Sequence, residues 1–422
     1  MSDDAIFRKC ARRLIPFMAL LFVINLIDRV NVGFAALTMN KDLNLSAGTF
    51  GLAAGIFFLG YAALQIPANA IVERVGARRS VFCILLAWGA VSASTAFVQG
   101  PSSFYALRFL LGVAEAGFFP GMIFYLGLWF PQAYRARFTA LFMCANPASV
   151  VIGGPLSSLI LGMDGLLGLH GWQWLFLIEA LPACALALAV PWLLPDGPEK
   201  APWLGAAERD AIAARLGADQ IGLKRDLVSA LTDVRVFAVA LANAGTQIGL
   251  YGTTLWLPQI VQATGFSIRA TGFVVAVPYV LSMGAMVLWG RRSDVKHERI
   301  RHIAFPAFLS AAAFAMASVA QSNLVLLASI GFALIALFVI IPLMYSLVSS
   351  FLRGAAAAGA IALVNVGSVG GFLGPTLMGA LKAENGNYAP GLVAMALALA
   401  FCGAITLVLG RAIAPRVVAE SA

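Results

Sequence analysis

The sequence predicts an all-α integral membrane protein in which twelve transmembrane helices form two six-helix bundles related by a pseudo-two-fold axis. Three observations support this prediction: the composition, a series of long apolar stretches, and an internal repeat. Of the 422 residues, 61% are hydrophobic and only 11% are charged, and the mean hydropathy is +0.90. A chain with so few polar residues cannot cover itself with a polar surface, so the composition excludes an ordinary soluble protein.

A helix needs about 20 apolar residues to cross a bilayer. Stretches of this kind lie near residues 14–36, 48–71, 80–98, 103–130, 138–161, 173–194, 235–262, 269–290, 302–320, 324–351, 356–380 and 389–411. The one long connection opens with "PDGPEKAPW" and continues through the amphipathic "AERDAIAARLGAD". We therefore predict an N-terminal bundle over 1–194, a cytoplasmic central loop with a short amphipathic helix over 195–234, and a C-terminal bundle over 235–422.

Basic residues predict the orientation, because Lys and Arg are retained on the cytoplasmic side of a membrane. With the N-terminus inside, 23 of the 28 basic residues fall in cytoplasmic segments, and the outer face keeps only Lys41, Arg269 and Lys382. Both termini are then cytoplasmic, and the protein is integral to the cytoplasmic (inner) membrane. An alternative is a cleaved signal peptide, in which Arg12 and Arg13 precede an apolar run. Cleavage would leave eleven spans.

Similar landmarks recur at one spacing in the two halves of the chain. The loop "ERVGARR" follows the second predicted span and "GRRSDVKHER" follows the eighth, which places Glu73 and Asp294 221 residues apart. Pro155 and Pro375, in "GGP" and "LGP", are 220 residues apart. Two parallel halves facing each other are a transporter plan, with the substrate near the midplane between them.

The first of these loops resembles the motif G-x-x-x-D-R-x-G-R-R of the major facilitator superfamily. Asn69 stands at the position of the first glycine, Glu73 replaces the aspartate, and the second copy keeps Gly290 and Asp294. The resemblance implies the fold of that superfamily, with a cytoplasmic gate in which the charges of the motif hold the two halves together. The gate residues it implies are Glu73, Arg74, Gly76, Arg78, Arg79 and Asp294.

Longer segments resemble one branch of that superfamily, the anion:cation symporters: "LIDRVNVGFAALTMNKDL", "GYAALQIPANAIVERVGARR", "LRFLLGVAEAGFFPG" and "WQWLFLIEALP". Members of the branch carry organic anions such as sugar acids, tartrate, phthalate and hydroxyphenylacetate. The resemblance covers nearly the whole chain and is strongest in its first half. It implies import of an organic carboxylate with protons by alternating access, and it does not fix the substrate.

Four charged residues lie deep in predicted spans, where each costs several kcal/mol unless it is paired or reaches water. At 1.5 Å per residue, Asp28 and Arg29 lie roughly 21 to 23 Å from the cytoplasmic start of the first span. Arg108 lies roughly 8 Å and Glu115 roughly 18 Å from the outer surface, within a hydrocarbon core about 30 Å thick. Arg108 and Glu115 also share one helical face, so we expect all four to line a single cavity.

The chemistry of these residues suggests a division of roles. Arg29 and Arg108 suit a carboxylate substrate, because a guanidinium matches carboxylate oxygens and keeps its proton. Asp28 and Glu115 suit proton coupling, since a buried carboxyl beside an arginine can gain or lose a proton when substrate enters. The resemblance assigns Arg29 to substrate and Glu115 to proton coupling. The alternative is a pair of inert ion pairs, Asp28 with Arg29 and Arg108 with Glu115.

Weaker candidates are polar side chains at cavity depth that could hydrogen-bond a substrate: Tyr61, Gln247, Tyr251, Asn146 and Asn365. Packing between helices explains each of them about as well. The resemblance favours Tyr61, Gln247 and Tyr251 for contact with substrate. The remaining charged residue of the first half's spans, Glu179, is interpreted as structural, bonding to neighbouring helices.

An enzymatic function has little support. The three histidines, His170, His297 and His302, lie in or beside loops on different faces, so we predict no catalytic residues, metal site or cofactor. No ATP-binding loop motif and no nucleic-acid-binding motif occurs, so the energy for transport must come from a gradient. The expected partners are a small organic anion, protons and membrane lipid, and the two-bundle plan is expected to work as a monomer. An uncoupled facilitator or anion exchanger is the alternative function, followed by a non-transporting ligand sensor.

Overall fold

The computed structural model describes residues 3–219, 233–352, 360, 364, 367–382 and 386–419. The described residues form α-helices and short 3-10 turns, and no strand occurs among them. Nine helical stretches in this part of the chain are long and apolar enough to cross a membrane. The prediction of an all-α membrane fold is therefore confirmed, and these spans are consistent with a twelve-helix arrangement.

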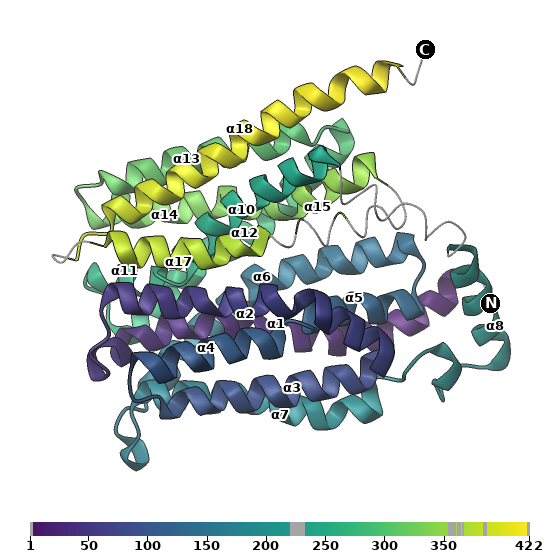
Figure 1. Cartoon of the computed structure of the whole chain (residues 1–422), viewed down its shortest axis with the longest axis horizontal. Coiled ribbons are helices and arrows are strands. Elements are labelled where there is room, and N and C mark those ends of the chain that lie inside the picture. The colour runs from purple at the N-terminus through teal and green to yellow at the C-terminus, as the bar shows by residue number, and fades with distance from the viewer. Residues whose placement is uncertain are drawn as a thin grey trace.

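The helices lie side by side in two groups, one from each half of the chain (Figure 1). In the first half the helices are α1 (Asp3–Asp42), α2 (Ala47–Val75), α3 (Ala77–Ser94), α4 (Pro101–Glu115), α5 (Phe118–Trp129), α6 (Gln132–Leu161) and α7 (Gly171–Leu193). The predicted central loop contains α8 (Ala206–Asp219). In the second half they are α10 (Val234–Thr254), α11 (Leu257–Ala263), α12 (Ile268–Lys296), α13 (Ile300–Ser318), α14 (Asn323–Phe338), α15 (Ile340–Phe351), α17 (Gly370–Leu381) and α18 (Ala389–Ala419).

Three predicted spans are each divided into two helices: 103–130 into α4 and α5, 235–262 into α10 and α11, and 324–351 into α14 and α15. In each case the first helix ends four or five residues before a proline, which is Pro120, Pro258 or Pro342. Proline has no N–H to donate to the carbonyl of the residue four positions earlier, and its ring clashes with that carbonyl. This explains the breaks. Pro155 and Pro375 lie within helices that continue past them.

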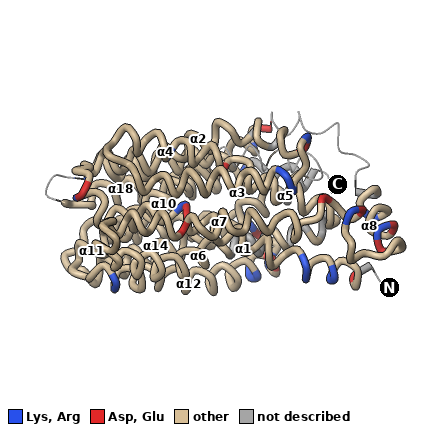
Figure 2. Tube along the Cα trace, turned by 90° about the horizontal axis from the view of Figure 1, so that it is seen from below, with Lys and Arg blue, Asp and Glu red and all other residues tan. Residues whose placement is uncertain are grey.

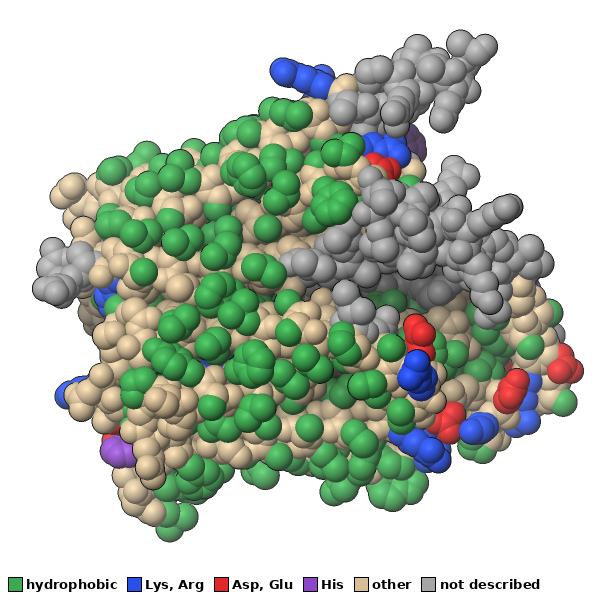
Figure 3. Space-filling view, viewed as in Figure 1, with side chains coloured by type: hydrophobic (Ala, Val, Ile, Leu, Met, Phe, Trp, Pro, Cys, Tyr) green, Lys and Arg blue, Asp and Glu red, His purple; other side chains and the backbone are tan. Residues whose placement is uncertain are grey.

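The two ends of the bundle differ in charge. Both termini and α8 lie at one end, which we call the terminal end, and α11 lies at the opposite end, the far end (Figure 1). Lys, Arg, Asp and Glu gather mostly toward the terminal end (Figure 2). Between the ends, hydrophobic side chains spread over the visible face of both groups of helices (Figure 3), and Leu188, Val277, Phe305 and Leu397 are exposed. Such apolar sides suit contact with lipid.

At the far end the two halves meet through glycines that leave no room for a side chain. An ideal Cβ on Gly272 of α12 would lie 2.3 Å from the carbonyl oxygen of Gly154 in α6. An ideal Cβ on Gly51 of α2 would lie 2.5 Å from the carbonyl oxygen of Pro375 in α17. Gly51 and Gly272 are 221 residues apart, so the repeat places the same cross-half contact twice. This is the arrangement that a pseudo-two-fold relation requires.

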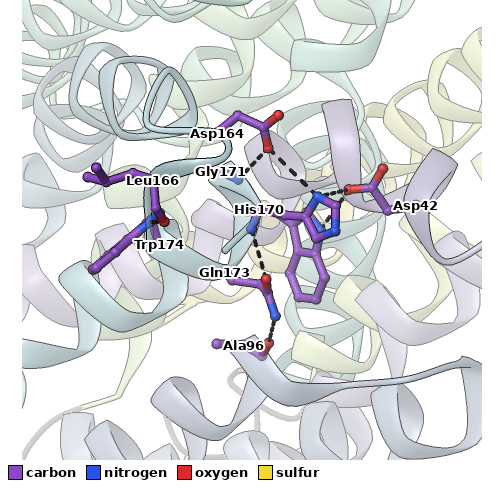
Figure 4. A network of polar contacts seen from close by, with 9 residues as sticks. Asp42, Ala96, Asp164, Leu166, His170, Gly171, Gln173 and Trp174 are labelled. Carbon is purple, nitrogen blue, oxygen red and sulfur yellow. Dashed lines mark hydrogen bonds and ion pairs between the residues drawn. The ribbon is translucent and has the colours of Figure 1, made fainter. Parts of the chain in front are cut away.

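A polar network also ties the first half together at the far end (Figure 4). Trp172 donates its Nε1–H to Asp42 Oδ2 at 2.9 Å, and His170 Nδ1 lies 3.3 Å from the same oxygen. Asp164 Oδ1 accepts the backbone N–H of Gly171 at 2.8 Å. These contacts hold the end of α1 against the loop and helix start that connect α6 to α7. His170 thus belongs to a polar contact at the end of the bundle.

Candidate functional site

The four charged residues predicted for the cavity come together within the first half. Asp28 and Arg29 lie near the middle of α1, and Arg108 and Glu115 lie on α4. Asp28, Arg108 and Glu115 are at most 1% exposed, whereas the Arg29 side chain keeps 11% of its surface accessible. Of the four side chains, that of Arg29 is therefore the most accessible.

Arg29 and Glu115 form the central ion pair. Arg29 Nη2 lies 2.6 Å from Glu115 Oε2, and Asn25 donates its Nδ2–H to the same oxygen at 2.8 Å. The guanidinium carbon of Arg29 lies 5.2 Å from the ring centroid of Phe57 and 5.0 Å from that of Tyr61. In the described part of the chain, Glu115 Oε1 and Arg29 Nε have no hydrogen-bond partner. Both members of the pair therefore keep unused hydrogen-bonding capacity.

Asp28 faces a different set of neighbours. Its Oδ2 accepts the indole N–H of Trp88 at 2.6 Å, and its Oδ1 accepts from Asn31 Nδ2 at 3.1 Å and from the Ser92 hydroxyl. Adjacent residues on a helix point in different directions, which explains why Asp28 does not pair with Arg29. The alternative of an Asp28–Arg29 ion pair is therefore wrong for this structure.

Arg108 is the unusual member of the group. It is almost fully buried, yet none of its three guanidinium nitrogens has a hydrogen-bond partner among the described residues. Its guanidinium carbon lies 5.0 Å from the ring centroid of Phe57, which offers a favourable cation–π contact. The alternative ion pair of Arg108 with Glu115 does not form here either, because Glu115 pairs with Arg29. A buried charge without hydrogen bonds is costly, so a position that keeps one is a candidate for ligand binding.

The weaker candidates divide into three groups. Tyr61 is buried beside Arg29, and Tyr251 of α10 packs against Phe58 with ring centroids 4.3 Å apart, which brings the second half against the same region. Gln247 lies one turn from Tyr251 on α10 and is half-buried. Asn146 is half-buried on α6. Asn365 lies outside the described residues.

Several residues around this site were not selected from the sequence. Asn25, Asp28 and Asn31 form a polar row at spacings of three in an otherwise apolar run, and this spacing is a signal that could have identified Asn25. Trp88 comes from α3 and Tyr345 from α15, where Tyr345 lies in the electrostatic surroundings of Tyr61 and Tyr251. Neither has a charged neighbour in sequence, so their proximity depends on how the helices pack.

The residues of the predicted cytoplasmic gate lie at the terminal end. Glu73, Arg74 and Arg79 are exposed, and Gly76 joins α2 to α3 with φ of +93°, a conformation that favours glycine. Arg78 donates to the carbonyl oxygen of Pro191, and its Nη1 lies 4.0 Å from Asp196 Oδ2.

In the second half, Asp294 pairs with Arg299. The partners that the structure describes for Arg78 thus lie in α7 and at the start of the central loop, and the partner of Asp294 lies in the second half. The structure shows no latch between Arg78 and Asp294. The described contacts join the halves closely at the far end.

Two matching groups of apolar helices, with charged side chains buried inside the first group, define a membrane transporter rather than an enzyme. The chain belongs to the major facilitator superfamily, whose sequence model matches residues 18–375.

Comparison with known proteins agrees with this assignment. A protein of Agrobacterium vitis named "Putative tartrate transporter" is 46% identical over 97% of this chain and 95% of its own length. A protein of Acinetobacter baumannii named "Quinolone resistance transporter" is 38% identical over 94% of this chain and 93% of its own. The crystal structure of a bacterial homologue of the human lysosomal transporter Spinster, inward-facing and unoccupied, matches with a TM-score of 0.78 at 16% identity, covering 96% of this chain and 97% of that one. At this identity the structural likeness supports the fold alone.

Proposed function

We propose that the protein is a proton-coupled symporter that imports an organic carboxylate anion by alternating access. The observation that carries the proposal is the Arg29–Glu115 ion pair, because Arg29 is paired to a carboxylate and its side chain keeps some accessible surface. The similarity to the Agrobacterium vitis protein supports an organic anion such as tartrate as the substrate.

The ion pair provides a direct mechanism of coupling. A substrate carboxylate that binds Arg29 must displace Glu115, which would leave a buried, unpaired carboxylate at a cost of several kcal/mol. Protonation of Glu115 removes that cost, since the neutral acid no longer needs the guanidinium. Proton binding and anion binding therefore favour each other, and neither is stable alone. Release of both on the other side restores the ion pair.

Arg108 strengthens the binding of the anion. With Asp28 and Glu115 ionised, the two carboxylates balance the two guanidinium groups, and protonation of Glu115 leaves one net positive charge in the site. The unused N–H groups of Arg108 can then donate hydrogen bonds to the oxygens of a second carboxylate or a hydroxyl of the substrate. A dicarboxylate with hydroxyl groups fits two arginines together with the polar groups of Tyr61 and Gln247.

Asp28 is proposed as the second proton-coupling residue. Three donors stabilise its charged form in this state, so its protonation requires that some of these hydrogen bonds change. A change of that kind accompanies rearrangement of α3 against α1, which links the protonation of Asp28 to the conformation of the first half.

The closed far end supports an inward-facing state. The backbones at Gly51 and Gly272 contact the opposite half there, whereas Arg78 and Asp294 of the gate motif do not pair with each other. We place the terminal end in the cytoplasm and the protein in the inner membrane, because most basic residues lie in segments of that side. We also propose that the protein works as a monomer surrounded by lipid.

The test is tartrate uptake by purified protein in liposomes with an imposed pH gradient. Acidification outside should accelerate uptake and drive accumulation, and an ionophore that collapses the gradient should abolish accumulation. Uptake that ignores the outside pH would support the facilitator or exchanger, and binding of tartrate without uptake would support the sensor.

Glu115→Gln separates coupling from transport. The variant should retain exchange of tartrate across the membrane, because the neutral side chain no longer competes for Arg29, and should lose pH-driven accumulation. Glu199→Gln, at an exposed glutamate of the central loop, is the matched control and should behave as the wild type. Accumulation by Glu115→Gln at the wild-type level would contradict the role of Glu115.

A further inference from the structure

A basic pocket lies on the first part of α1, at the terminal end and away from the proposed transport site. The N-terminus and α8 lie together at this end (Figure 2). The pocket has a volume of about 460 Å³ and is lined by Ala5, Arg8, Lys9, Arg12 and Arg13. These residues form two neighbouring rows at steps of four along the helix, so they share one side of it. Four cations around one pocket attract an anion.

An acidic partner neutralises only one of the four basic residues. Lys9 Nζ lies 2.9 Å from Glu208 Oε1 and 2.7 Å from Glu208 Oε2, both in α8. Arg8 donates its Nε–H to the backbone carbonyl oxygen of Asp4 at 3.1 Å. In the part of the chain that the structure describes, no carboxylate lies within ion-pair distance of the three arginines. The pocket therefore keeps uncompensated positive charge.

The central loop holds one of these arginines in place. The guanidinium carbon of Arg13 lies 5.2 Å from a ring centroid of Trp203, and Trp203 stacks on the buried Trp129 of α5 with centroids 5.4 Å apart. The Lys9–Glu208 ion pair fixes the loop to α1 beside this stack. A guanidinium stacked on a ring keeps its in-plane N–H groups free to donate. Packing thus positions Arg13 while leaving its donors available.

The exposed side of α1 changes from basic to apolar within about one helical turn. Arg12 and Arg13 directly precede Leu14, where the apolar run of the first predicted span begins. Pro16 and Leu20 follow Arg12 at steps of four and are exposed, Leu20 by 46%. Guanidinium groups next to an apolar surface match the two parts of a phospholipid, a charged headgroup and an acyl chain.

We propose that the basic pocket binds the headgroup phosphate of an anionic phospholipid from the leaflet at the terminal end. The three arginines donate to the phosphate oxygens, which a guanidinium matches in a bidentate manner, and an acyl chain lies along Pro16 and Leu20. Basic pockets beside membrane spans bind anionic headgroups in this way. The site is separate from the transported anion, since a small carboxylate has no acyl chain to cover the apolar side of α1.

The experiment measures the unfolding temperature of the purified full-length protein in detergent as lipid is added. Phosphatidylglycerol, which is anionic, should raise this temperature more than zwitterionic phosphatidylcholine, because a ligand of the folded state stabilises it. Arg12→Gln/Arg13→Gln should weaken the binding of phosphatidylglycerol about 30-fold. Arg12→Gln alone, at a side chain with no described protein partner, should weaken it about fivefold without disturbing the Trp203 stack.

The matched control removes two adjacent arginines from the second half. Arg291 and Arg292 are exposed and directly follow the eighth predicted span, as Arg12 and Arg13 directly precede the first. Arg291→Gln/Arg292→Gln should therefore keep the wild-type affinity for phosphatidylglycerol. Equal weakening in both double variants would show a general attraction to surface charge and would overturn the site. Wild-type affinity in Arg12→Gln/Arg13→Gln would overturn it as well.

Two further measurements identify the ligand. Native mass spectrometry should find one more phosphatidylglycerol retained on the wild type than on Arg12→Gln/Arg13→Gln, and equal numbers would contradict the proposal. Inorganic phosphate carries the charge without the acyl chains, so it should not raise the unfolding temperature at the concentrations at which phosphatidylglycerol does. An equal rise with inorganic phosphate would indicate a site for a soluble anion and would refute lipid binding.

Discussion

Replacing Gly272 by alanine should shift the protein away from the state with the closed far end. In the present structure the added Cβ would lie 2.3 Å from the Gly154 carbonyl oxygen and 2.3 Å from the Ser158 hydroxyl. The carbonyl belongs to the backbone of α6 and cannot move without moving that helix. Overpacking of this kind costs about 1–3 kcal/mol, and a tenfold change in an equilibrium corresponds to about 1.4 kcal/mol. The closed far end should therefore lose about 5- to 150-fold in population relative to a state in which α6 and α12 separate.

A matched control lies on the same helix. Gly284 of α12 has nothing within 4 Å of its ideal Cβ, so Gly284→Ala adds the same methyl group without a collision. Alanine also favours a helix over glycine by up to about 1 kcal/mol, and this contribution is common to both variants. The difference between Gly272→Ala and Gly284→Ala therefore isolates the contact between the halves.

Pulsed electron paramagnetic resonance measures the separation of the halves at the far end. Spin labels at Leu166 and Val319, both exposed, report on the first and second halves in a background without native cysteines. Gly272→Ala should increase the fraction of long distances, and Gly284→Ala should leave the distribution unchanged. Equal distributions in the two variants would refute the reasoning that this glycine contact closes the far end.

Two further substitutions test the charges. Arg108→Met removes a buried guanidinium without hydrogen bonds, so the ligand-free protein should gain thermal stability. Its affinity for tartrate, measured by thermal-shift titration, should fall at least tenfold. Unchanged affinity would exclude contact between Arg108 and the substrate. Outside the spans, burial tends to raise the pKa of Glu298, but hydrogen bonds from Arg301 and His302 more than offset it and hold the pKa below its usual range. Glu298 therefore stabilises the fold above its unfolded pKa, and this contribution is lost as the pH falls through the folded pKa. Glu298→Gln should lower the unfolding temperature at neutral pH, consistent with a helix cap of about 1 kcal/mol. The difference in unfolding temperature between variant and wild type should vanish in acid. An equal difference at both pH values would contradict a stabilising role of the ionised Glu298.

The positions of the spans could be predicted from the sequence because each depends on a local run of apolar residues. The break between α4 and α5 could also be predicted from the sequence, since Pro120 removes a helix hydrogen bond at a fixed distance along the chain. Arg29, Arg108 and Glu115 could be selected because a charge in an apolar run is conspicuous.

Their partners could not be predicted in the same way. Depth along a helix places Arg108 and Glu115 on one face, but the rotation of α1 against α4 decides that Glu115 pairs with Arg29. Trp88 of α3 contacts Asp28 of α1, and no local pattern in the sequence predicts that these two helices pack together. The wrong ion pairs came from treating nearness along the chain as nearness in space.

The division of the fourth span has a mechanical consequence for Glu115. This residue is the last of α4, and Pro120 interrupts the backbone hydrogen bonds directly beyond it. The charge of Glu115, which is proposed to change with each proton, therefore lies between two helices, where few backbone hydrogen bonds resist bending. Gain or loss of that charge can change the angle between α4 and α5 without bending a continuous helix.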